Sequence, residues 1–142
     1  MQTRETLDPQ EALVCTMVLV AAAETGGISD REIGVMATLV QTLPAFHHFT
    51  NGRLRGAADA AVNLLREADG LAHAGRLMRD SLSPRLRETA YTLACEVVAA
   101  EAEQGQAILQ MLDFIGTELR LDKLTTAAIE RGTRARYQRI EG

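Results

Sequence analysis

The stretch that decides the fold is Ser83–Asp122, which reads SPRLRETAYTLACEVVAAEAEQGQAILQMLDFIGTELRLD. Ser83 followed by Pro84 is a typical helix start, because serine caps a helix and proline suits its first position. Small and apolar residues follow as far as an acidic corner at Glu101–Gly105. Beyond the corner, apolar residues recur at helical spacing: Ile108, Leu109, Leu112, Ile115 and Leu119. The stretch therefore predicts a helical hairpin.

An earlier stretch repeats this plan. Asp8 and Pro9 start a helix that runs to Ala23 and is apolar nearly all round, which is typical of a buried central helix. A capping box from Ser29 to Glu32 starts the next helix, and Pro44 ends it. Its apolar residues match those of the second hairpin at an offset of 76 residues: Ile33, Met36, Leu39 and Leu43. This register indicates an internal duplication, although any two amphipathic helices can be slid into register.

Three further helices complete the predicted fold. They span about Gly52–Ala68, Leu71–Leu82 and Lys123–Tyr137, and Asp122 caps the last one. The connector Ala45–Phe49 carries two aromatic residues, which we expect to tuck under the bundle. No linker divides residues 1–142, so the sequence predicts one domain, an all-α bundle of about seven helices with two related hairpins.

The composition sets outer limits on the function. The chain has 142 residues, of which 46% are hydrophobic and 24% charged, with a net charge of −4. These values are typical of a soluble globular domain and argue against nonspecific nucleic-acid binding. The longest uncharged run near the start, Ala12–Ala23, is shorter than the roughly 20 residues needed to span a bilayer. With no signal-peptide pattern, the expected location is the cytoplasm.

The two cysteines are best interpreted as structural. Cys15 and Cys95 each stand alone in an apolar run, where cysteine usually acts as a small buried hydrophobe. Their spacing fits neither a zinc site nor a redox pair. The sequence also lacks a phosphate loop, a dinucleotide fingerprint, a zincin motif and a nucleophile elbow. An enzyme using Glu96 and Glu101 finds no supporting constellation, so we expect a non-enzymatic protein.

Four glutamates are candidate ligands for a divalent cation: Glu24, Glu96, Glu101 and Glu103. Glu24, Glu101 and Glu103 lie near helix C-termini, where a carboxylate meets the negative end of the helix dipole and a cation would offset the repulsion. Antiparallel hairpins would bring both corners to one end of the bundle. Such oxygen ligands suit calcium, magnesium or manganese. The alternative is a solvated acidic corner.

Glu96 has a second interpretation. It is the only charge between Ala90 and Ala100, so it is either buried with a partner or marks the helix face that reaches water. Arg87 and Arg31 are the candidate partners.

Other polar clusters are weaker signals. His47 and His48 are adjacent on a connector and make a poor chelate alone. The last helix has a basic end, which is either a solvated face or a contact for an anionic partner or lipid headgroup: Arg131, Arg134, Arg136 and Arg139. Tyr137 is the only aromatic residue among them, which argues against specific nucleic-acid recognition.

The sequence resembles the TerB-like domain of tellurite-resistance proteins, in particular small stand-alone members from alphaproteobacteria. Four segments carry the resemblance, and the last two are the most specific: PQEALV at 9–14, LVQTLPAF at 39–46, RLRETAY at 85–91 and LTTAAIERG at 124–132. The resemblance implies an all-helical fold with two related halves. It also implies a non-enzymatic role in tellurite resistance or stress response, metal binding at the acidic corners, and partners at the membrane.

The acidic corners depart from the family pattern. Thr25 stands in place of an aspartate in the first corner, where Glu32 is kept. In the second corner Glu101–Gly105 replaces the Asp-Gly pair, and Ile108 stands where a glutamate is expected. Two functions therefore stay open. One is a TerB-like accessory protein with a degraded cation site, and the other is a helical protein-interaction module, with a second copy of the chain as one candidate partner.

Overall fold

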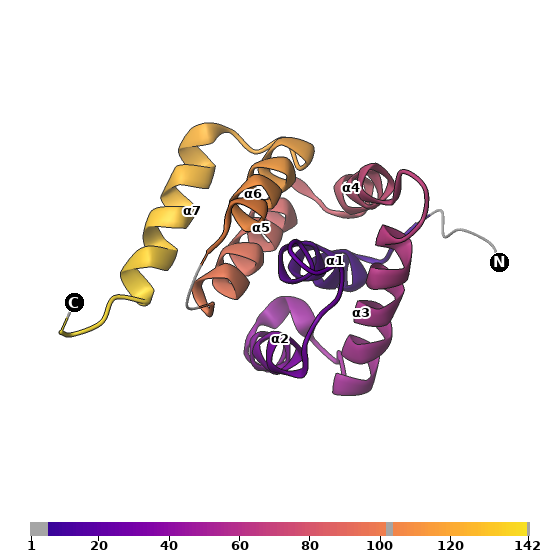
Figure 1. Cartoon of the computed structure of the whole chain (residues 1–142), viewed down its shortest axis with the longest axis horizontal. Coiled ribbons are helices and arrows are strands. Elements are labelled where there is room, and N and C mark those ends of the chain that lie inside the picture. Colours follow the sequence, from indigo (N-terminus) through magenta and orange to yellow (C-terminus); the bar gives the residue numbers. More distant parts are fainter. Residues whose placement is uncertain (1–5, 102–103, 142) are drawn as a thin grey trace.

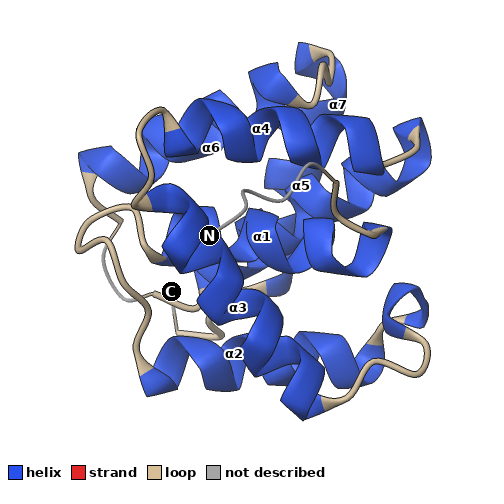
Figure 2. Ribbon diagram, turned by 90° about the vertical axis from the view of Figure 1, so that its right-hand side faces the viewer, coloured by secondary structure: helices blue, strands red, loops and turns tan. Residues whose placement is uncertain are grey.

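The structure is a computed structural model that describes residues 6–101 and 104–141. Within these residues the chain is all-helical, as predicted, with no strand (Figure 2). Its helices are α1 (Pro9–Ala21), α2 (Asp30–Thr42), the short 3-10 helix η1 (Pro44–Phe46), α3 (Asn51–Leu65), α4 (Gly70–Ser81), α5 (Pro84–Ala99), α6 (Gln106–Glu118) and α7 (Lys123–Arg136).

The starts predicted from caps are confirmed, while the third helix begins one residue before the predicted Gly52, at Asn51. Asp8 and Ser29 form capping boxes with Glu11 and Glu32, in which each partner satisfies a free backbone N–H group. Single N-caps begin α3, α5 and α7: the side chains of Thr50, Ser83 and Asp122 each accept a hydrogen bond from the backbone N–H three residues later.

The predicted helix ends were less accurate. The first helix ends at Ala21 rather than Ala23, and the third at Leu65 rather than Ala68. In both places the chain leaves the helix through a short turn, where composition still favours helix. The fourth helix begins one residue earlier than predicted, at Gly70.

Helix α1 is the centre of the bundle (Figure 1). Its residues Ala12–Val20 are all buried, because α1 packs against α2, α3, α4, α5 and α6. The buried hydroxyl of Thr16 donates a hydrogen bond of 2.9 Å to the carbonyl of Ala12, so it adds no unsatisfied group to the core. The prediction of a buried central helix is confirmed.

The connector before α3 closes one end of the bundle. Phe46 and Phe49 are both buried, with ring centroids 5.4 Å apart, as the sequence predicted. The Arg53 guanidinium lies 4.6 Å from the centre of the Phe49 ring. Gln10 of α1 donates hydrogen bonds to two connector carbonyls and so ties the connector to the central helix.

Helix α5 is the second centre and packs most extensively against α1. The helix boundaries support the internal duplication, because α2 and α6 are both 13 residues long and begin at Asp30 and Gln106, 76 residues apart. Helices α1, α2 and α3 thus correspond to α5, α6 and α7. Helix α4 has no counterpart among the described residues; it packs on α1, α3 and α6.

Helix α7 is the most peripheral element (Figure 1). It packs closely against α5 and forms no comparable contact with α6. Thr133 is its one buried residue. The third helix of the second half therefore stands away from the second, and this position creates the site described next.

Candidate functional site: a cleft between α6 and α7

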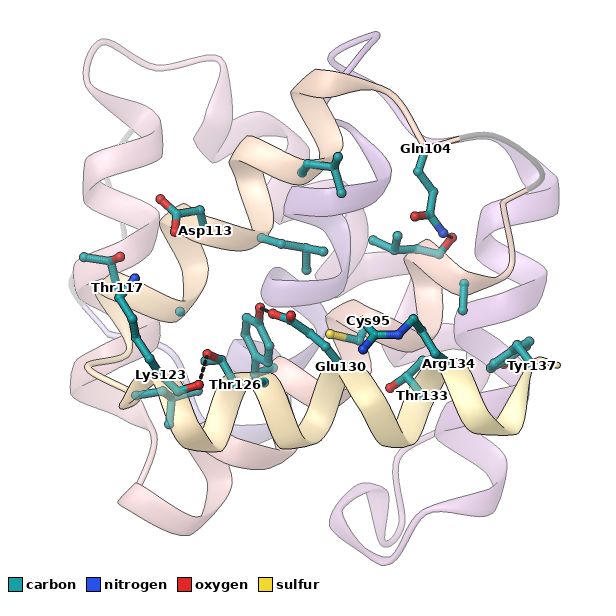
Figure 3. A pocket seen from close by; sticks show the side chains of 18 of the residues that line it. Cys95, Gln104, Asp113, Thr117, Lys123, Thr126, Glu130, Thr133, Arg134 and Tyr137 are labelled. Atoms are coloured by element: carbon teal, nitrogen blue, oxygen red, sulfur yellow. Dashed lines mark hydrogen bonds between the residues drawn. The ribbon is translucent and has the colours of Figure 1, made fainter.

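A pocket of about 810 Å³ lies over α5, between α6 and α7 (Figure 3). This volume is within the range of ligand-binding pockets. The apolar part of its wall is formed by Val98, Ala99, Leu109, Leu112, Gly116, Leu121 and Ala127. Polar side chains come mainly from α7: Lys123, Thr126, Glu130, Thr133, Arg134 and Tyr137. We call this pocket the α6–α7 cleft.

The first half of the chain shows why the cleft exists. At the offset of 76 residues, Leu112 and Gly116 of α6 correspond to Met36 and Val40 of α2. Met36 and Val40 are buried, whereas Leu112 is only half-buried and Gly116 has no side chain. The first part of the apolar stripe, Leu109 and Leu112, is therefore more open than its counterpart in α2, whereas Ile115 and Leu119 farther along α6 are fully buried.

The third helices differ more strongly. Aligned on their caps Thr50 and Asp122, the positions of Ala58 and Val62 in α3 hold Glu130 and Arg134 in α7. Ala58 and Val62 are buried against the core. A carboxylate and a guanidinium cannot take those places without a large desolvation cost. The α7 sequence therefore favours a helix that stays at the edge of a water-accessible cleft.

Tyr91 and Glu130 connect the floor of the cleft to α7. The buried Tyr91 hydroxyl donates a hydrogen bond of 2.5 Å to Oε2 of Glu130. Burial, this hydrogen bond and the nearby negative charges, including Asp113, raise the pKa of Tyr91 above its ordinary value. The phenol therefore remains a hydrogen-bond donor at neutral pH, and the pair holds α7 to α5.

Cys95 lies in the cleft wall beside this pair (Figure 3). Burial, aided by the charges of Glu130 and Glu96, raises its pKa to about 12. Cys15 of α1 is buried too, and burial raises its pKa to about 12. Both thiols are free, as expected from the sequence. They are protonated at neutral pH, which makes them poor nucleophiles.

Glu96 is buried and paired, with a partner that the sequence did not indicate. Its Oε1 lies 2.9 Å from Nε of Arg136 at the end of α7. Neither Arg87 nor Arg31 fills this role. Arg87 donates to the carbonyls of Leu82 and Arg79. Arg31 is engaged at the second corner.

A second interaction links Glu96 to the end of α7. The Glu96 carboxylate and partial burial raise the pKa of Tyr137. The buried Glu96 therefore acts as an anchor for the end of α7, at a distance in sequence that no local pattern reveals.

The two acidic corners do meet at one end of the bundle. The Glu24 carboxylate lies so close to Gly105 that a Cβ atom there would overlap it. Arg31, at the start of α2, donates to Oε2 of Glu101 at 3.3 Å and to the carbonyl of Ala100 at 2.9 Å. An arginine thus supplies positive charge at the carboxyl end of α5, where the helix dipole is negative.

The four predicted metal ligands are not brought together as far as the structure describes them. Glu24 and Glu101 are at the joined corners, Glu96 is held by Arg136 at the end of α7, and Glu103 lies outside the described residues. In residues 6–101 and 104–141, no group of three or more histidines, cysteines, aspartates or glutamates is placed to hold a metal ion.

The cleft itself was not predicted from the sequence. A usable signal was present in the third helices, where polar Glu130 and Arg134 replace small apolar residues of the matching helix. Comparisons with known proteins add no further guide, since no family model, curated protein or solved structure matches the chain. Within the described part of the chain, every helix is too short or too polar to cross a membrane.

Proposed function

We propose that this protein is a non-enzymatic interaction domain whose α6–α7 cleft receives apolar side chains of a protein partner. The proposal develops the interaction-module hypothesis from the sequence. It places the contact on one defined surface, made by α6, α7 and the cleft between them.

The distribution of exposed apolar side chains carries this proposal. Among the described residues, four large hydrophobic side chains are exposed, and all four belong to α6, α7 or the segment after α7: Leu109 at 49%, Leu124 at 82%, Tyr137 at 44% and Ile140 at 103%. Leu109 and Tyr137 also line the cleft. An apolar surface that continues from the floor of a cleft to its rim is typical of a protein-binding site.

The chemistry of the cleft favours binding over catalysis. Its thiol is protonated at neutral pH, and its tyrosine hydroxyl is committed to Glu130. These groups shape and anchor the cleft, which is what a recognition site requires.

The test is selection of helical peptides from a phage-displayed library against the full chain. We expect enriched peptides that bind the parent protein and lose at least tenfold in affinity to Leu109→Lys, which places a charge at the cleft rim. Gln110→Lys is the matched control, because Gln110 is exposed on the same helix and does not line the cleft. Failure to enrich any peptide, or equal losses in both variants, would contradict the proposal.

A TerB-like accessory role with a cation site is the second candidate. It is favoured by the meeting of Glu24 and Glu101 at one end of the bundle. Against it, Arg31 already neutralises Glu101. If this candidate is right, adding calcium, magnesium or manganese to chelator-treated protein should raise its free energy of unfolding. The increase should be about 2.7 kcal/mol when the ion is at 100 times its dissociation constant, and it is measured by thermal unfolding. The absence of any shift at millimolar ion would exclude this candidate.

A further inference from the structure

We infer that the segment recognised by the α6–α7 cleft is an amphipathic helix with an acidic flank, which lies along α7. The inference rests on the proposed function and adds the chemistry of the partner. Its three supports are the shape of the cleft, the charge of α7 and the repulsion that two copies of this chain would experience.

The shape of the cleft fits a helix. Both of its walls are helical, with α6 contributing residues from Leu109 to Thr117 and α7 contributing residues from Lys123 to Tyr137. A concave groove with an apolar floor takes the apolar face of an added helix, whose anchors recur at positions i, i+3, i+4 and i+7. A flat lipid surface would leave this concave floor unfilled.

The positive charges of α7 favour acidic residues on the partner helix. Lys123 and Arg134 line the cleft at positions 11 residues apart, which is about 16 Å along a helix. Neither forms an ion pair with another described residue. Arg131 and Arg139 are also exposed on α7 and the segment that follows it. Carboxylates on the flank of a bound helix would pair with Lys123 and Arg134, while Arg131 and Arg139 outside the cleft would add only a weaker, salt-screened attraction.

The negative charges in the cleft define the opposite flank. Glu130 accepts the hydrogen bond of Tyr91, so its charge is turned toward the floor. Asp113 lies on the α6 wall. The partner helix should therefore carry its acidic residues on the side that faces α7 and neutral or basic residues on the side that faces α6.

The same charges disfavour a second copy of this chain as the occupant. A two-fold pair that buried the exposed apolar residues would bring two α7 helices together. Each would contribute Lys123, Arg131 and Arg134, and like charges across an interface are unfavourable. An acidic helix from a different protein meets the same surface without this repulsion.

The experiment uses the peptides selected against the full chain. We expect an excess of aspartate and glutamate on one side of the apolar positions, and affinity that falls with rising salt as exposed charge pairs are screened. Arg134→Glu should weaken binding at least tenfold. Arg131→Glu, on the same helix but outside the cleft, should weaken it less than threefold.

Three other results would contradict the inference, and each would identify a different occupant of the cleft. Enriched peptides that are neutral or basic, or that ignore Arg134→Glu, would overturn the acidic partner while leaving the cleft as a protein-binding site. A concentration-dependent dimer that Leu109→Lys abolishes would identify a second copy as the occupant. Binding to vesicles of anionic lipid that competes with the peptides would identify a membrane surface.

Discussion

The two halves of this chain use the same three-helix plan and reach different ends. In the first half, α2 and α3 close over α1, and Met36, Val40 and Ala58 are buried. In the second half, α7 packs on α5 and stands away from α6, so Leu109 and Leu112 of α6 face a cleft. The comparison teaches that a repeated three-helix unit can be closed by its third helix in one copy and left with a cleft beside that helix in the other.

Helix α4 accounts for a second difference between the halves. It covers α1, whose residues Ala12–Val20 are all buried. Helix α5 lacks such a cover and carries a polar row at Glu88, Thr92 and Glu96. The row follows the i, i+4, i+8 spacing of one helix face. Its buried member, Glu96, faces the end of α7, where Arg136 pairs with it.

The largest predicted effect contrasts two matched core positions. Met36→Ala should lower the free energy of unfolding by about 2–5 kcal/mol, because it leaves a cavity in a closed core. Leu112→Ala should cost only about 1 kcal/mol, because Leu112 already faces the cleft. Urea unfolding of both variants measures the difference, and equal losses would contradict the contrast between the halves.

The next effect concerns the anchor of α7. Arg136→Met should destabilise the protein by about 1–2 kcal/mol, since it leaves Glu96 buried without its partner. The cost is below that of a fully buried pair because Arg136 is largely exposed. The double variant Glu96→Ala, Arg136→Met should recover most of the loss by making α5 resemble α1. A double variant less stable than Arg136→Met would refute this explanation of Glu96.

The raised pKa values of the two thiols predict that the free energy of unfolding falls at alkaline pH. Their pKa is about 12 in the folded protein, against an ordinary value of 9.0. Above pH 9 the unfolded chain releases thiol protons while the folded chain keeps them, so unfolding becomes easier by roughly 1 kcal/mol for each thiol at pH 10. Cys15→Ala and Cys95→Ala should each remove part of this slope. A pH dependence unchanged in the double variant would exclude the thiols as its source.

A smaller effect separates two hydroxyl groups, Tyr91 and Thr16, which occupy matched positions when α5 and α1 are aligned on their caps Ser83 and Asp8. Tyr91→Phe removes the link to Glu130 and should cost about 1 kcal/mol and raise amide exchange in α7. Thr16→Val removes a hydrogen bond within α1 and should leave α7 exchange unchanged. Hydrogen exchange followed by mass spectrometry distinguishes them, and identical exchange in both variants would show that Tyr91 does not hold α7.

The sequence predicted the helices well because their starts are local events. A cap such as Ser29 with Glu32, or Ser83 before Pro84, acts within four residues and is legible in the chain. The partner of Glu96 was missed because Arg136 lies 40 residues away and approaches through tertiary packing. The cleft was missed for the same reason, since α2 and α6 share most of their apolar pattern and the position of the third helix is set by tertiary packing.

The measurement that tests the open second half most directly is the labelling of Cys95 and Cys15 by a maleimide under native conditions. Each thiol is read separately in a variant that lacks the other. Cys95 lines the cleft next to α7, whereas Cys15 lies on the central helix α1 and is buried in the core. We predict that Cys95 is labelled faster and at a rate independent of low denaturant, while Cys15 reacts only through global unfolding. Equal rates that both follow global unfolding would contradict the account.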